Sequence, residues 1–439
     1  MRTLNAMTEL APSDVADPLV VRTVAVPDVG PLADLLPHDD PRGAMSWIRR
    51  GDGLVAWGEA ARTDVAGPDR MARADAWFAD LGRRAVVRDE VGVRGTGAVA
   101  FGSFSFSPDS PAGGSLVVPR VVIGRRDGVS WLTTIETGAR VGPRPSLARE
   151  RSAAAPVREP RGVRSLAGAL EPAAWRRAVA DVVARIRAGE AAKVVLARDS
   201  WASADEPVDV RSLLRRLAGD YDSCWTFAVD GLVGATPELL VRRERGLVAS
   251  RVLAGTIRRT GDDDADLARA ATLARSSKDL EEHEFAVSSL AAALAPFAAT
   301  ANVPEVPSVL HLPNVMHLAT DVTAVLDEVG DEAPSSLALA AALHPTAAVC
   351  GTPTDVAARI IAEAEGMDRG RYAGPVGWLG ADGDGEWGIA LRCAEVSTDD
   401  PRRLRLFAGC GIVAASDPVA ELAESEAKLV PVRSALGIG

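Results

Sequence analysis

Lys193 is the residue whose surroundings first suggest chemistry. It lies in the run 192–198, whose other members are mostly valine, leucine and alanine. Such a run favours a β-strand, so the lysine projects from one face of a sheet while its neighbours pack a core. Burial disfavours the charged form of an amine and lowers its pKa, which makes a lysine in a partly dry site a candidate general base. The alternative is a lysine whose stem lies on apolar surface while its head reaches water.

A carboxyl group in an apolar context provides the matching acid. Glu238 follows Thr236 and Pro237 and precedes two leucines, a pattern that predicts a turn leading into a strand. A carboxyl group that enters a core is costly when ionised, so its pKa rises and it can hold a proton at neutral pH. Glu238 is therefore a candidate general acid, and a turn glutamate in water is the alternative.

Two acidic clusters at helical spacing are candidates for binding a metal ion. Glu282 lies in the charged run 276–284, three residues before Phe285, and Glu424 lies four residues before Lys428. As ordinary helix surfaces, the first cluster would be a solvated face and the second an exposed ion pair worth ~0.3–0.5 kcal/mol. If Glu282 and Glu424 instead face a cleft, Mg²⁺ is the expected ion, because it binds one or two carboxylates and keeps water ligands.

Two further features offer groups that bind anions. Arg392 stands in the apolar segment 389–394, and Gly409 and Gly411 follow a strand-like segment. A guanidinium in that setting either pairs with an internal carboxylate or binds the carboxylate of a substrate. Glycines let backbone N–H groups approach an anion closely, although this short pattern alone has little specificity.

The chain that must position these groups has ordinary globular composition. It has 439 residues, of which 47% are hydrophobic and 25% charged, enough for one large domain or two. The formal net charge of −11 provides no basic field for nucleic acid or an anionic membrane, so an anionic substrate must be bound locally.

Further features of the sequence bear on its setting. The four cysteines are scattered and form no CxxC pair, which argues against a zinc site or disulfides and favours a reduced cytoplasm. We expect no secretory signal and no membrane span.

The patterns along the chain predict an α+β fold. Residues 18–140 show short β-type segments, such as 116–123, with weak helical periodicity, and a Pro-, Arg- and Ala-rich stretch at 142–162 is the boundary candidate. We therefore predict a β-rich N-terminal half over residues 1–160 and a catalytic region over residues 161–439. Helices alternate with strand pairs in the second half, which indicates antiparallel sheets backed by helices rather than a doubly wound parallel sheet. The expected helices cover 175–189, 265–294 and 418–436, and the expected strands cover 225–229, 239–242, 374–379, 387–394 and 404–407.

In order along the chain, these motifs resemble those of the chorismate-utilising enzymes, and most closely the isochorismate synthases among them. The resemblance covers about residues 165–436, with shorter echoes at 53–62 and 101–106. It implies a large α+β sandwich of orthogonally packed antiparallel sheets flanked by helices, with the active site in a deep cleft. The matching stretches are KVVLAR at Lys193, ATPELL at Glu238, 254–256, KDLEEH at Glu282, HPT at His344, GPVG at 374–377, ALRCAE at Arg392, AGCGIV at Gly409 and residues 421–428.

The resemblance also implies roles. Lys193 would activate water for attack at C2 of chorismate, and Glu238 would protonate the departing C4 hydroxyl. Glu282 and Glu424 would bind Mg²⁺, which in turn holds the ring carboxylate. The protein would act in the cytoplasm as a monomer without a glutaminase subunit, and isochorismate would feed menaquinone or siderophore biosynthesis. Substrate contacts are expected from Gly255, Thr256, His344, Ala348, Val349, Arg392, Gly409 and Lys428.

Departures from the pattern separate the branches of the family. Relatives that install an amino group lack a lysine where Lys193 stands, and the aminodeoxychorismate branch carries a lysine where this chain has Ala254. Both branches are disfavoured. Salicylate synthases keep the same base and acid and then eliminate pyruvate from isochorismate, so they remain the alternative. A remote alternative is a non-catalytic chorismate-binding protein, whose signature would be a degraded Lys193 or Glu238.

Overall fold

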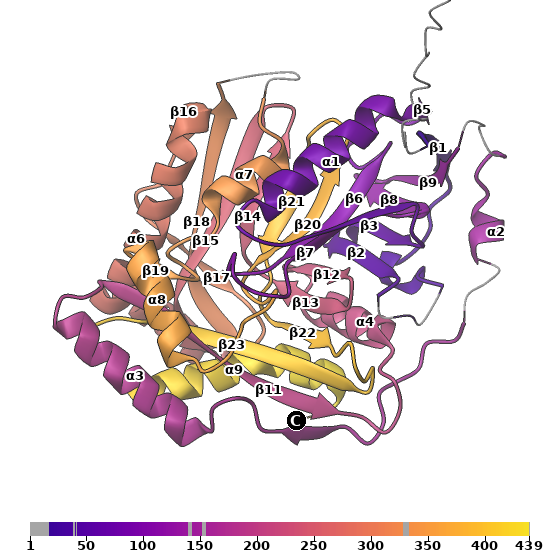
Figure 1. The fold of residues 1–439 in the computed structure, drawn as a ribbon. Helices are drawn as coiled ribbons and strands as arrows, with labels where there is room; N and C mark the ends of the chain where they lie inside the picture. The colour runs from indigo at the N-terminus through magenta and orange to yellow at the C-terminus, as the bar shows by residue number, and fades with distance from the viewer. Residues whose placement is uncertain are drawn as a thin grey trace, which may run out of the picture.

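The computed structural model describes residues 17–37, 40, 42–138, 143–151, 155–327 and 333–438. Two large β-sheets form its centre, and helices cover them from outside (Figure 1). Within the described residues every strand pairing is antiparallel except that of β1 with β5. The helices are α1 (Arg70–Arg84), α2 (Leu147–Arg151), α3 (Pro172–Arg187), α4 (Val210–Asp220), α5 (Asp263–Leu273), α6 (Ser277–Leu294), α7 (Ser336–Leu343), α8 (Thr354–Ala364) and α9 (Pro418–Leu436). The predicted α+β class is confirmed.

The first sheet, sheet A, has thirteen strands in the described part of the chain. In spatial order they are β10 (Arg164–Leu166), β11 (Lys193–Ser203), β23 (Arg403–Ile412), β22 (Cys393–Val396), β13 (Leu232–Thr236), β12 (Trp225–Val229), β2 (Ala44–Arg49), β3 (Asp52–Trp57), β8 (Val121–Arg126), β9 (Val129–Thr137), β1 (Leu19–Val26) and β5 (Val86–Asp89), with β19 (Gly351–Thr352) paired to β11.

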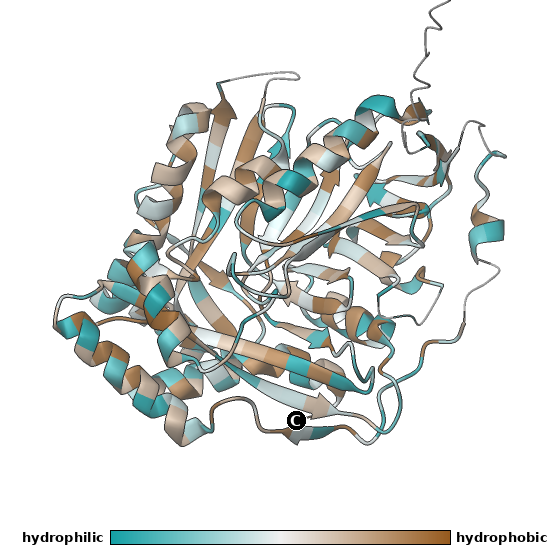
Figure 2. Ribbon diagram, viewed as in Figure 1, coloured by the Kyte–Doolittle hydropathy of each residue, from teal (hydrophilic) through white to brown (hydrophobic). Residues whose placement is uncertain are grey.

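The second sheet, sheet B, has ten strands among the residues described. They are β16 (Ala298–Asn302), β18 (Val315–Leu326), β15 (Leu247–Arg258), β14 (Leu239–Glu244), β21 (Gly385–Ile389), β20 (Pro375–Gly380), β6 (Val99–Phe104), β7 (Gly114–Val118) and β4 (Ala61–Val65), with β17 (Ser308–His311) paired to β18. Several central strands are buried along their whole length, among them β6, β12 and β20, and the helices carry both hydrophobic and hydrophilic residues (Figure 2).

Strands from both sides of residue 160 lie next to each other in each sheet. In sheet A, β2 pairs with β12, and Trp47 lies opposite Phe227. In sheet B, β6 pairs with β20, and Phe101 lies opposite Trp378. Both sheets are therefore built jointly by the two halves, and a boundary near residue 160 remains a prediction.

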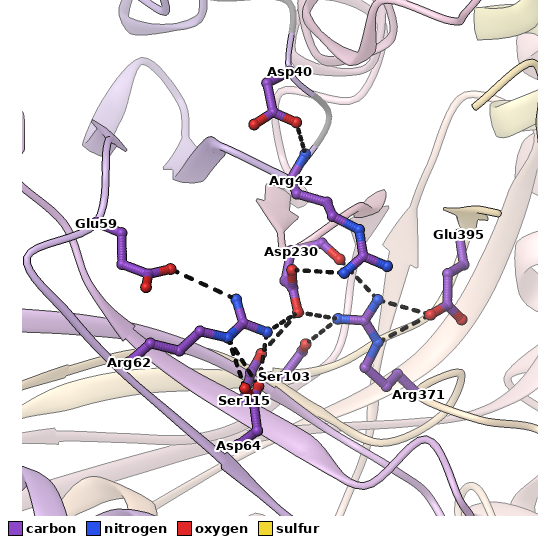
Figure 3. A network of polar contacts seen from close by, with 10 residues as sticks. All are labelled: Asp40, Arg42, Glu59, Arg62, Asp64, Ser103, Ser115, Asp230, Arg371 and Glu395. Carbon is purple, nitrogen blue, oxygen red and sulfur yellow. Dashed lines mark hydrogen bonds and ion pairs between the residues drawn. The ribbon is translucent and has the colours of Figure 1, made fainter. Parts of the chain in front are cut away.

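A network of ion pairs ties the two halves together near the turn between β12 and β13 (Figure 3). The Asp230 carboxylate lies 2.7 Å from Nη2 of Arg62 and within ion-pair distance of Arg42 and Arg371. Arg371 also contacts Glu395, with 2.7 Å between Nη2 and Oε1. Burial disfavours the charged carboxylate, but these guanidinium groups hold the pKa of Asp230 below its usual value.

Several expected elements are wrong in their extent. The single helix expected over 265–294 is two helices, α5 and α6, because the Ser276 hydroxyl accepts a hydrogen bond from the backbone N–H of Asp279 and starts a new helix. The segment 116–123 is two strands in different sheets, β7 in sheet B and β8 in sheet A. The strand expected over 387–394 is interrupted, because Arg392 has a left-handed backbone with φ of 49°.

A helix is also present where the sequence indicated mainly strands. In α1, the residues Met71, Ala74, Phe78 and Leu81 are buried at intervals of three and four. This periodicity is short and lies among β-type segments.

No helix in the described part of the chain is both long and apolar enough to cross a membrane.

Candidate active site

One cavity collects most of the residues that the sequence suggested for chemistry. It holds about 560 Å³ of empty space, including its opening to solvent. Lys193 and Glu424 lie directly beside it, since each forms an ion pair with a residue of its lining. Nine of the predicted residues line it: Glu238, Gly255, Thr256, Glu282, Ala348, Val349, Arg392, Gly409 and Lys428.

Lys193 is the first residue of β11, and its side chain is fully buried. Its Nζ lies 3.2 Å from Oε1 of Glu282, which projects from α6. This contact is an ion pair without a hydrogen bond, because Nζ of Lys193 has no hydrogen-bond partner among the described residues. The predicted strand is confirmed, and the alternative of a head group in water is wrong.

The glycine pair on β23 makes room for this contact. A Cβ at Gly411 would overlap Oε1 of Glu282 and lie 3.0 Å from Cε of Lys193. Gly409 contributes its carbonyl oxygen, which accepts a hydrogen bond of 2.9 Å from Nζ of Lys428. Gly411 therefore serves the close packing of charged side chains, a different reason from the approach of backbone N–H groups to an anion.

Glu238 lies just before β14 and is 5% exposed. Burial raises the pKa of Glu238 to about 8, although Lys193, Arg392 and Lys428 act in the opposite direction. The carboxyl group is therefore protonated at neutral pH and can donate a proton. The expected rise in pKa agrees with this environment, and a turn glutamate in water does not.

Arg392 is oriented by a histidine that the sequence did not single out. Nη2 of Arg392 lies 3.0 Å from Nε2 of His317, whose Nδ1 lies 3.1 Å from Oγ1 of Thr256 and 3.3 Å from the carbonyl oxygen of Gly255. Burial and the neighbouring Arg392 lower the pKa of His317 well below its usual value, so the ring is neutral. We assign the proton to Nδ1, which leaves Nε2 to accept from Arg392. The sequence signal for His317 was weak: one polar ring inside the apolar strand β18.

Lys428 and Glu424 form a half-buried pair on α9, with 2.6 Å between Nζ and Oε1. Burial lowers the pKa of Lys428, but Glu424 raises it more, so the amine stays charged. Lys428 in turn keeps the pKa of Glu424 below its usual value despite burial. The alternative of an exposed surface pair is wrong, because tertiary packing places this face of α9 against the cavity.

Of the two carboxylates predicted to bind a metal ion, Glu424 lies in a cluster of possible metal ligands among the described residues. Ligand atoms of Glu421, Glu424 and Cys410 lie within 4.8 Å of one another, and Glu421 also pairs with Lys278 at 2.8 Å. Burial and the nearby Glu424 raise the pKa of Glu421. This repulsion between carboxylates would be relieved by a cation. Burial raises the pKa of the Cys410 thiol well above its usual value, so oxygen atoms are the available ligands.

These donors fit Mg²⁺, which prefers carboxylate oxygens and water. Glu282, the other predicted ligand, is not part of this cluster and lines the cavity from α6. Glu421 is an additional candidate ligand that stood in the matching stretch 421–428 without an assigned role.

His344 lies outside this cavity. It is buried, and its Nε2 lies 3.0 Å from the carbonyl oxygen of Ala373. Its ring stands edge-on to Phe106, with centroids 5.7 Å apart, and it lines a separate, larger hollow near the start of α8. Burial lowers the pKa of His344 to about 4, so the ring is neutral. The structure therefore does not bring His344 together with the other predicted substrate contacts.

Comparison with known proteins places this cavity in context. A family model described as "Chorismate binding enzyme" matches residues 9–437. Isochorismate synthase DhbC of Bacillus subtilis is 43% identical over 61% of this chain and 69% of its own length. The salicylate biosynthesis isochorismate synthase of Pseudomonas aeruginosa is 32% identical over 95% of this chain and 90% of its own. The structure of MenF, the menaquinone-specific isochorismate synthase of Escherichia coli, matches with a TM-score of 0.74 and 26% identity, over 96% of this chain and 95% of that one.

Proposed function

Since the chain belongs to the family of chorismate binding enzymes, we propose that it is an isochorismate synthase, an isomerase that converts chorismate to isochorismate. The observation that carries this proposal is a protonated acid, Glu238, in one cavity with the cations Arg392 and Lys428 and beside Lys193. Moving a hydroxyl group from one ring carbon to another requires an acid and a base of different pKa, together with groups that bind a dianion.

In the proposed reaction, Lys193 takes a proton from a water molecule that attacks C2 of chorismate. The ring double bonds shift, and Glu238 gives its proton to the hydroxyl group that leaves C4 as water. One water is consumed and one released, so substrate and product are isomers. Glu238 is suited to its step because it is protonated at neutral pH.

Nζ of Lys193 lies 3.2 Å from Oε1 of Glu282, so the proposed base stands next to a proposed metal ligand. Glu282 and Glu424, with Glu421 as a further candidate, would hold Mg²⁺. When bound, Mg²⁺ would supply positive charge for the ring carboxylate of chorismate.

The remaining residues hold the substrate. Arg392, oriented by His317, and Lys428 offer fixed positive charge to the carboxylates of chorismate. Ala348 and Val349 line the apolar part of the cavity. Because Arg392 is buried and both cations are held by neighbours, little reorganisation is needed when the anion binds.

The deciding experiment incubates the purified protein with chorismate, with and without Mg²⁺, and separates the products by chromatography. We expect a mixture of chorismate and isochorismate that forms only with Mg²⁺. Accumulation of salicylate and pyruvate would place the protein with the salicylate synthases, and unchanged chorismate would contradict the proposal.

Two variants belong in the same experiment. Lys193→Ala should lower kcat by about 10²–10⁴-fold, the usual contribution of a general base, while substrate still binds. In Glu282→Gln, activity should require a higher Mg²⁺ concentration than in the wild type. An unchanged Mg²⁺ dependence would show that Glu282 does not bind the metal ion.

A further inference from the structure

Among the described residues, one edge of β11 lacks a neighbouring strand along its middle. On one side, β23 pairs with β11 from Val194 to Ser203. On the other side, β19 pairs only with Lys193 and Val194, and β10 pairs only with residues 201–203. Backbone groups between these two short strands need other partners, because unpaired polar groups in a buried strand are costly.

Side chains take the place of the missing strand. The backbone N–H of Ala197 donates to Oε1 of Glu365 at 2.6 Å, and the carbonyl oxygen of Val195 accepts from Nη2 of Arg369 at 2.8 Å. The carbonyl oxygen of Ala197 accepts from Nε1 of Trp175 at 3.1 Å. Glu365 directly follows α8, which packs beside β11 (Figure 1).

Glu365 and Arg369 also bind each other in a fork. Nε of Arg369 donates to Oε2 of Glu365 at 2.9 Å, and Nη2 donates to Oε1 at 2.5 Å. Nη1 donates to the carbonyl oxygen of Val349 at 2.9 Å. The two residues are 2% and 3% exposed, so both charges are buried. Two apolar side chains would often be as stable as such a pair, but they would not satisfy the backbone of Val195, Ala197 and Val349.

These contacts join two parts of the candidate active site. Lys193, Val195 and Ala197 alternate along β11 and share one face, and Val195 and Val349 both line the cavity. A displacement of the strand at Val195 would therefore move Lys193, two residues away. Arg369 lines the cavity too, and together with Glu365 it separates the cavity from the larger hollow that His344 lines.

We propose that Glu365 and Arg369 are positioning residues: their ion pair fixes the strand that carries Lys193 against the segment of Val349. This proposal rests on the proposed function, because it concerns how the base of that reaction is held. Neither residue is expected to touch the reacting atoms of the substrate.

The test compares the full-length wild-type chain with Glu365→Gln and Arg369→Lys. Glutamine removes the charge that holds the guanidinium, and lysine keeps the charge but cannot fork between Glu365, Val195 and Val349. We expect kcat for isochorismate formation to fall by on the order of 100-fold, as small misplacements of reacting groups do. KM should change by less than about twofold, since Arg392 and Lys428 are untouched.

Thermal unfolding and hydrogen exchange of the β11 amides accompany the kinetics. Exchange of the Ala197 amide should be faster in Glu365→Gln, because its acceptor is weakened. The matched control is Glu363→Gln, on α8 but 61% exposed and paired only with Arg185 among the described residues, which should leave kcat and exchange unchanged.

Each result decides the question. Folded variants with wild-type kcat would overturn the proposal, and so would two variants that fail to fold, since the pair would then be a folding element. Loss of kcat with KM retained supports it. A wild-type chain that makes no isochorismate would overturn the proposed function instead. Hydrogen exchange would still show whether the pair holds β11, and unchanged exchange in Glu365→Gln would refute that.

Discussion

At the scale of single residues, the protonation of Glu238 connects the environment of the cavity to activity. Its raised pKa, about 8, means that the folded chain binds a proton there that the unfolded chain releases at lower pH. Glu238 therefore favours the folded state most at low pH, and this contribution is lost as pH rises from the ordinary carboxyl pKa of about 4.3 to about 8.

For the wild-type chain, we predict that kcat/KM falls as pH rises through about 8, because the acid loses its proton. Glu238→Gln cannot donate a proton and should lower kcat by about 10²–10⁴-fold. The measurement is a pH–rate profile, with Glu284→Gln on the exposed face of α6 as the control. Full activity of Glu238→Gln would rule out its acid role.

Glu238→Gln also makes a prediction about stability. Because glutamine carries no charge, the variant should unfold at a higher temperature than the wild type above about pH 8 and lose this advantage at low pH. Thermal melts at several pH values would check it. Equal melting curves at all pH values would show that the carboxyl is not buried as described.

At the scale of elements, β23 contributes to the site because Gly411 has no side chain. Gly411→Ala should push Glu282 and Lys193 apart, because the added methyl overlaps the carboxylate. We expect kcat to fall by about 10–100-fold as reacting groups are displaced. Gly219→Ala on α4 is the matched control, since its Cβ meets nothing within 4 Å. It should keep kcat and gain about 0.5–1 kcal/mol of stability. Wild-type kcat in Gly411→Ala would mean that the pair adapts.

The ion-pair network around Asp230 is a second feature at this scale, because it links elements from both halves of the chain (Figure 3). Asp230→Asn leaves the buried Arg371 and the more exposed Arg42 and Arg62 without their shared carboxylate, and we predict a loss of about 3–5 kcal/mol in the free energy of unfolding. The backbone itself tolerates the change, since Asp230 has φ of 50° and asparagine also adopts this conformation. Urea denaturation would measure the loss.

The comparison for this prediction is Asp64→Asn. Asp64 pairs with the same Arg62, but its side chain is 67% exposed, so the cost should be ~0–1 kcal/mol. Similar losses in the two variants would show that burial of the network adds nothing.

At the scale of the whole molecule, the two sheets make the halves of the chain dependent on each other. The fragment 161–439 would expose the edges of β12 and β20 that β2 and β6 cover. We predict that this fragment shows no cooperative thermal transition by circular dichroism, while the full chain melts in one transition. A sigmoidal melt of the fragment, with near-ultraviolet signals of packed aromatic rings, would show that the catalytic region folds alone.

What the sequence determined by itself is mostly local. The strand at Lys193, the strand entry at Glu238 and the helix over 418–436 follow from periodicity and from turn residues, which act over a few positions. Charged groups in apolar runs, such as Lys193, Glu238 and Arg392, are visible without a structure, whereas Gly255, Thr256, Ala348 and Val349 were expected only from the resemblance to the family. Nine of the predicted site residues line one cavity.

The tertiary structure decided which of these groups meet. The pairing of Lys193 with Glu282, the orientation of Arg392 by His317 and the support of β11 by Glu365 and Arg369 join residues far apart in the chain. No periodicity encodes such contacts, because they depend on the register of strands and the docking of helices. The same reason places His344 outside the cavity. Local patterns determine whether a segment is a helix or a strand. Long-range packing determines which charged groups share a site and how their pKa values shift.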